Sequence, residues 1–113
     1  MHEMSLAEGI LELIEDAARR EGFGRVRTVF LEIGRLSSVE PEAMAFCFDA
    51  VARGSRAEGS KLDIFIVPGT GFCLDCGRET MLDAVYDACE HCGSVPVKVT
   101  GGTEMRVKEL DVE

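Results

Sequence analysis

Apolar side chains recur every three or four residues near the start of the chain, which is the spacing of one face of an α-helix. Ser5 followed by Glu8 has the form of a capping box, and a pair of arginines just before Gly22 suits a helix C-terminus. The pattern predicts an amphipathic helix over about residues 5–21 with an acidic outer face. Its apolar positions are Leu6, Ile10, Leu13, Ile14 and Ala17.

A strand and a second helix are predicted next. From residue 25 to Gly34, apolar residues alternate with other types, as in a strand with one face on a core. Ser37 and Ser38 offer helix caps, and Pro41 suits a first helical turn. Apolar residues then repeat at helical spacing as far as Gly54. They are Met44, Cys47, Phe48 and Val51.

Two further strands complete the predicted sheet. An alternating run over residues 62–66 forms the second strand, which Pro68 ends. Residues 104–112 resemble a last strand, and the phase of their apolar residues changes near Lys108, so we expect a bulge there. The last strand should rejoin the first two in one sheet.

The segment between Gly69-Thr70-Gly71 and Gly101-Gly102 differs in character, because it holds four cysteines and few large aliphatic residues. We interpret it as an inserted module. The expected fold class is α+β, with two helices packed on a three-stranded sheet and a four-cysteine zinc-ribbon module before the last strand. Residues 1–69 plus 101–113 would form one domain, which would bind nickel if the chain start is a metal site. Residues 70–100 would form a zinc-binding domain.

Composition narrows the function classes. A chain of 113 residues with 46% hydrophobic and 29% charged residues is typical of one folded domain. Twelve Lys and Arg against 21 Asp and Glu give a net charge of −9, which disfavours nucleic-acid binding. No run approaches the ~20 apolar residues of a membrane span, and the first residues do not form a signal peptide. We therefore expect a cytoplasmic protein without membrane contact.

The four cysteines form two CxxC pairs with twelve residues between the pairs, and a glycine follows each pair. Each CxxC turn brings two sulfurs to one ion, and four thiolates complete a tetrahedron without an open position. The spacing therefore predicts one structural zinc rather than a catalytic one. The expected ligands are Cys73, Cys76, Cys89 and Cys92.

Alternatives remain for the cysteines. A disulfide framework or a thioredoxin-like redox pair fits the doubled spacing less well, and iron is not excluded because four thiolates suit both metals. His91 lies inside the second CxxC pair, and we expect it to face solvent because the cysteines saturate zinc. The fifth cysteine, Cys47, is expected to be a small core residue.

A second metal site is suggested at the chain start. The α-amine of Met1, the backbone nitrogen of His2 and the His2 imidazole can close adjacent chelate rings around one ion. Nickel or copper suits such a nitrogen-rich field, and Glu3 could add a carboxylate or its backbone nitrogen. Amines and imidazoles titrate near neutrality as classes, so such a site should weaken as the pH falls.

These features together resemble the HypA/HybF family of hydrogenase maturation nickel chaperones, over the whole chain. The resemblance rests on the opening Met-His-Glu-Met-Ser-Leu-Ala and on the CxxC-x12-CxxC pattern. It also includes Glu32-Ile33-Gly34 at the end of the first strand and Val39-Glu40-Pro41-Glu42 at the start of the second helix. The second CxxC pair lacks a proline that many relatives have, which suggests a role for His91 in communication between the two metals.

The resemblance implies a carrier rather than an enzyme. It implies that the N-terminus binds Ni(II) and passes it, with a nickel-handling GTPase of the HypB type, to the large subunit of nickel–iron hydrogenase. His2 would be the essential nickel ligand, with the Met1 amine and Glu3 completing much of the site, while the cysteines hold Zn(II). Glu40 would be an additional nickel ligand or a carboxylate that favours the helix start.

Further partners, the assembly state and a rival function follow from the same residues. The same resemblance leaves urease maturation proteins as further partners, and the chain could be a monomer or a homodimer. The rival function is a zinc-ribbon module that binds proteins or nucleic acid without delivering nickel. For nucleic acid the basic patch is missing, because residues 70–100 contain only Arg78 and Lys98 as cations.

Overall fold

The computed structural model describes residues 2–113, which form two helices and six strands in two three-stranded sheets. The expected fold class is confirmed: both helices pack on the first sheet, and the cysteine module is inserted before the last strand. The elements are α1 (His2–Glu21), β1 (Val26–Gly34), α2 (Pro41–Ala52), β2 (Lys61–Val67), β3 (Gly69–Cys73), β4 (Glu79–Leu82), β5 (Val97–Gly101) and β6 (Met105–Val112).

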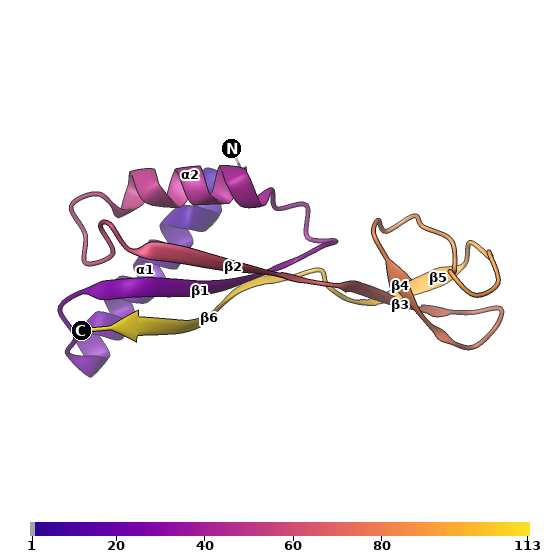
Figure 1. Ribbon diagram of the computed structural model, residues 1–113. Helices are drawn as coiled ribbons and strands as arrows, with labels where there is room; N and C mark the ends of the chain where they lie inside the picture. The colour runs from indigo at the N-terminus through magenta and orange to yellow at the C-terminus, as the bar shows by residue number, and fades with distance from the viewer. Residues whose placement is uncertain (1) are drawn as a thin grey trace. The chain divides into compact units, whose positions relative to one another are not determined.

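The first sheet has the strand order β2-β1-β6, so the last strand rejoins the first two as expected. Figure 1 shows α1 crossing behind this sheet with α2 beside it. Alternate side chains of the central strand are buried, and they form one core with the inner faces of the helices. Its main members are Ile10, Ile14, Val29, Leu31, Met44, Cys47 and Phe48.

Helix α1 differs from the prediction at its start and on its inner face. It begins at His2, so Ser5 lies inside the helix and the predicted capping box is wrong. A tertiary contact explains the difference, because the Glu3 carboxylate accepts a hydrogen bond from the backbone N–H of Glu40. Leu13 is 49% exposed, and the buried face instead runs through Ala7, Ile10, Ile14, Ala17 and Ala18.

Helix α2 is capped by Glu40, whereas the sequence pattern had favoured two serines. The predicted caps, Ser37 and Ser38, are wrong, and Ser38 has a φ of 66°, outside the extended conformation of an N-cap. Pro41 occupies the first helical turn and disfavours helical geometry in the residue before it. Glu40 is therefore extended, and its carboxylate accepts from the backbone N–H of Glu42 at 2.9 Å.

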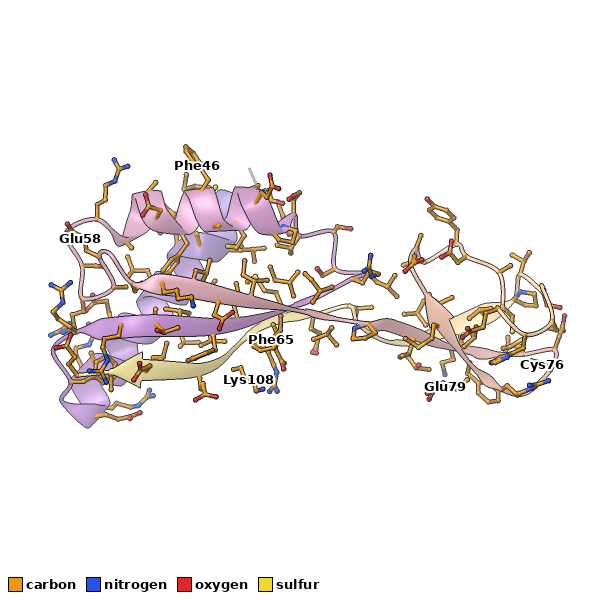
Figure 2. All side chains as sticks on the ribbon, in the orientation of Figure 1. Phe46, Glu58, Phe65, Cys76, Glu79 and Lys108 are labelled. Atoms are coloured by element: carbon orange, nitrogen blue, oxygen red, sulfur yellow. The ribbon has the colours of Figure 1, made fainter. Side chains whose placement is uncertain are left out.

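The far side of the first sheet is less covered than the helix side. Phe65 on β2 is 51% exposed, and the Lys108 ammonium lies 5.3 Å from the centre of its ring (Figure 2). On β6 the burial pattern changes phase at Lys108 and Glu109. The bulge expected near Lys108 stays a prediction.

The chain divides into two compact units. The first comprises the chain up to residue 31, residues 39–65 and residues 106–113; the second comprises residues 32–38 and 66–105. The second sheet, with strand order β4-β3-β5, lies in the second unit, and we had not predicted its strands. How the two metal functions divide between domains stays a prediction. Within residues 2–113, no helix is both long and apolar enough to cross a membrane.

Glycines permit close backbone packing in the second unit. A Cβ added to Gly34 would overlap the carbonyl oxygen of Gly102. Gly102 itself has a φ of +80°, and its Cβ would collide with the carbonyl oxygen of Pro68. The Leu36 N–H donates to this same Gly102 carbonyl at 2.7 Å. Only residues without a side chain fit where these segments meet.

Candidate metal centres

Four cysteine sulfurs meet at one point in the second unit, and each can offer one ligand atom within 4.8 Å of all the others. The Cys73 and Cys92 sulfurs are 3.6 Å apart, and the Cys76 and Cys89 sulfurs are 3.8 Å apart. A tetrahedral zinc with bonds of about 2.3 Å needs sulfurs about 3.8 Å apart. Two of the six sulfur–sulfur separations are near this value and all are within 4.8 Å, so the cluster suits a four-coordinate metal ion. Iron held by four thiolates has the same donor set.

Both CxxC turns have the same local structure. Gly77 and Gly93 have φ values of +70° and +76°, and their N–H groups donate to the carbonyl oxygens of Cys73 and Cys89. A positive φ strains residues with side chains, which explains a glycine after each pair. The sulfurs also accept backbone hydrogen bonds: Cys76 N–H donates to Cys73 Sγ, and His91 N–H to Cys89 Sγ, both at 3.4 Å. Figure 2 labels Cys76 in the turn after β3.

The thiols have unequal acidities. Desolvation raises the pKa of Cys76 to about 11. Desolvation also opposes ionisation of Cys89, but hydrogen bonds from the backbone of Cys92 and His91 outweigh it and lower the pKa of Cys89 to about 6. Hydrogen bonds from Ser94 lower the pKa of Cys92. Four sulfurs this close cannot all ionise without a cation, so the cluster is suited to one.

The second CxxC turn is fastened to strand β4 by side chains that we had not singled out. Thr80 is 1% exposed, and its hydroxyl accepts from the Glu90 N–H at 3.0 Å. The Glu90 carboxylate accepts from the Met81 N–H at 2.6 Å. The His91 ring lies 3.0 Å from the Glu79 carbonyl oxygen through Nε2, and its side chain is exposed as expected. These contacts hold the Cys89–Cys92 turn in place.

The first turn of α1 carries the predicted nickel ligands that the structure describes. The His2 side chain is 58% exposed, whereas that of Glu3 is 14% exposed. His2 Nδ1 lies 3.9 Å from Glu3 Oε2. A helix that begins here leaves the N–H groups of its first turn without acceptors inside the helix. Backbone nitrogens and two side-chain donors are thus close together, while Met1 lies outside the described residues.

Glu3 and Glu40 join the starts of the two helices. Glu3 Oε2 accepts from the Glu40 N–H at 3.2 Å, and this bond is the largest cause that lowers the pKa of Glu3. The Glu40 carboxylate is turned to its own helix, where it caps Glu42. Among residues 2–113, the four cysteines are the one set of three or more His, Cys, Asp or Glu ligand atoms close enough for a metal ion.

Comparison with known proteins finds one family that matches almost the whole chain. The family model described as "Hydrogenase/urease nickel incorporation, metallochaperone, hypA" matches residues 1–112. The chain is 60% identical over 113 residues to the hydrogenase maturation factors HypA of Albidiferax ferrireducens and of Dechloromonas aromatica, covering all of each protein. It is also similar to the solution structure of the Ni metallochaperone HypA from Helicobacter pylori. There the identity is 27%, the TM-score is 0.69, and 97% of this chain and 96% of that one are covered.

Proposed function

Because the chain belongs to the HypA family of hydrogenase and urease nickel-incorporation metallochaperones, we propose that it carries Ni(II) at its N-terminus. It passes the ion, with a nickel-handling GTPase of the HypB type, to the large subunit of nickel–iron hydrogenase in the cytoplasm. Its role is that of a maturation factor without a catalytic reaction of its own. The cysteine cluster holds Zn(II), which organises the second unit.

The observation that carries the nickel assignment is the juxtaposition of His2 and Glu3 in the first turn of α1. The His2 Nδ1 atom and the Glu3 carboxylate are already neighbours, and the backbone nitrogens of this turn make no bond within the helix. Nδ1 is also the imidazole nitrogen that closes a small chelate ring with the residue's own amide nitrogen. The Met1 amine completes the nitrogen set that nickel prefers. The resemblance adds Glu40 as a candidate further ligand.

A carrier has to release its ion as well as hold it. The His2 ring is more than half exposed, so a partner's ligands can approach the ion without unfolding the core. The zinc cluster is different, because a closed thiolate tetrahedron has no open position for an incoming ligand. Cys73 and Cys89 are 0% and 3% exposed, whereas Cys92 is exposed. The two centres therefore suit opposite tasks, transfer at the chain start and structure in the second unit.

The test is a metal titration of the untagged protein and of two single variants. His2→Ala should abolish tight nickel binding because it removes the imidazole, and it should leave one zinc bound. His91→Ala is the matched control, because His91 is the only other histidine of the chain. It should leave nickel affinity unchanged, and that result would also exclude the role in communication between the two metals that the second CxxC pair suggests for His91. An extension ahead of Met1 should also abolish nickel binding, because it removes the free amine.

The delivery role depends on this result. If the parent protein binds nickel no better than His2→Ala does, the proposal is wrong and a zinc-ribbon scaffold remains. Transfer itself is measured by mixing the nickel-loaded protein with the purified GTPase or large subunit and following nickel by mass spectrometry. Parallel mixtures with urease maturation proteins determine whether they are also served.

A further inference from the structure

We infer that Glu40 is a positioning residue of the proposed nickel site: its carboxylate fixes the first turn of α2, and its backbone N–H orients the Glu3 carboxylate. The inference rests on the proposed nickel function and assigns Glu40 a role other than that of a ligand. It concerns two hydrogen bonds, from the Glu40 N–H to Glu3 Oε2 at 3.2 Å and from the Glu42 N–H to Glu40 Oε1 at 2.9 Å.

The first hydrogen bond sets the direction of the Glu3 side chain. Glu3 is only 14% exposed although it lies at a helix start, and its Oε2 is held by a backbone donor. Carboxylates that bind metals are commonly oriented by such a second hydrogen bond, which leaves the other oxygen for the ion. Glu3 Oε1 is then the atom available to nickel. The donor sits at the positive end of a twelve-residue helix, which strengthens its hold on an anion.

The second hydrogen bond sets the direction of that donor. Glu40 has the extended backbone of an N-cap, and its own carbonyl accepts the first helical bond from the Met44 N–H at 2.9 Å. Its carboxylate caps the Glu42 N–H, so the side chain is turned along α2. Releasing this cap would free the first turn of α2 and, with it, the N–H that holds Glu3.

Competition between capping and ligation argues against a direct bond from Glu40 to nickel. A carboxylate that rotated toward an ion near Glu3 would leave the Glu42 N–H without its acceptor. Glu3, in contrast, already has His2 Nδ1 beside its carboxylate.

The experiment compares three substitutions at position 40 in the zinc-loaded full chain. Glu40→Gln and Glu40→Ser keep an N-cap acceptor, but neither carries a carboxylate for nickel. Glu40→Ala removes both. Glu42→Ala is the control, because it removes a neighbouring carboxylate of the same turn that is not the cap. Nickel affinity is measured by competition with a chelator, and the ligand set by the visible absorption bands of bound nickel.

If Glu40 positions Glu3, Glu40→Gln and Glu40→Ser should bind nickel within about threefold of the parent and show the same bands. Glu40→Ala should bind about five- to tenfold more weakly, the scale of a lost cap. The inference is overturned if Gln and Ser weaken binding as much as Ala and shift the bands, because Glu40 is then a ligand. It is overturned too if Glu40→Ala binds like the parent.

A measurement without nickel keeps this test separate from the proposed function. Amide exchange of Glu40 is followed by NMR in the parent and in Glu3→Ala. The Glu40 amide should exchange about fivefold faster, or more, in the variant because it loses its acceptor. An unchanged exchange rate of the Glu40 amide would overturn the inference even if the protein delivers nickel. Nickel binding that does not depend on His2 removes the delivery proposal but leaves this hydrogen bond in place.

Discussion

At the scale of single residues, polar groups outside the cysteine cluster hold the second CxxC turn and the proposed nickel ligand Glu3 in position. Thr80 and Glu90 tie the second CxxC turn to β4, and the backbone of Glu40 holds Glu3. Neither support has a sequence motif of its own. Each support is a hydrogen bond between segments that are distant in the sequence. Removing it should therefore lower the affinity of the site for its metal ion.

Thr80→Val should destabilise the cysteine module by about 1–3 kcal/mol, because valine has the same shape but leaves the Glu90 N–H without its acceptor. Zinc should also be lost to a competing chelator more readily, by about tenfold. Thr100→Val is the control, since the Thr100 hydroxyl is exposed and pairs with Thr70. Equal zinc retention by both variants would contradict the role given to Thr80.

Glu3 should make the first unit sensitive to acid. Its pKa is lowered in the folded protein, chiefly by the Glu40 N–H, so the ionised carboxylate favours folding. That contribution is present above the ordinary carboxyl pKa of 4.5 and is lost as the pH falls through the lower folded value. The NMR titration of the Glu3 carboxyl carbon should therefore have its midpoint below 4.5. A Glu40→Ala variant, which loosens the donor, should move that midpoint upward.

At the scale of elements, close approach rather than hydrophobic burial determines how the segments of the second unit meet. The Gly102 carbonyl accepts from the Leu36 N–H, and it occupies the space that a side chain at Gly34 would need. Backbone atoms cannot move aside as a flexible side chain can. The end of β1 and the turn before β6 are therefore intolerant of substitution, in contrast to the outer face of α1.

Two glycine-to-alanine changes should have opposite signs. Gly34→Ala should destabilise the protein by about 1–3 kcal/mol, because its Cβ would overlap the Gly102 carbonyl. Gly9→Ala should stabilise it by about 0.5–1 kcal/mol, because Gly9 is exposed inside α1 and nothing lies within 4 Å of the added atom. Urea denaturation of the zinc-loaded proteins measures both, and a destabilising Gly9→Ala would show that the glycine has another role.

At the scale of the whole molecule, the two units differ in what stabilises each of them internally. The first has a core built from both helices and the first sheet. In the second, the residues buried to within a few per cent include two of the metal-binding cysteines together with Leu82 and Thr80. The second unit should accordingly depend on its metal, while the first should not.

Removal of zinc with a strong chelator under reducing conditions should unfold the second unit and leave the first folded. Amide signals from β3, β4 and β5 should collapse to the shifts of an unfolded chain, whereas those of α1 and α2 should keep their positions. Zinc added back should restore the spectrum. Loss of signals throughout the chain would mean that one cooperative unit spans both parts.

Much of the fold and site follows from local pattern. Periodicity places α1, β1, α2 and β2 close to their observed bounds, because it records which side chains must leave water. The CxxC spacing brings four sulfurs together because the geometry of each turn is local and one ion needs two such turns. The net charge follows from the composition alone and does not depend on the fold.

Only the tertiary structure decided where the helices begin, which side chains cap them, and how the module is fastened. Glu3 and Glu40 are 37 positions apart, and Gly34 and Gly102 are separated by more than half the chain. A hydrogen bond or close approach of this kind produces no repeating pattern in the sequence, because each partner is a single residue among polar or small neighbours. The sequence alone therefore specified the two helices, the strands of the first sheet and the four-cysteine cluster, whereas three-dimensional packing determined how the proposed nickel ligands are held.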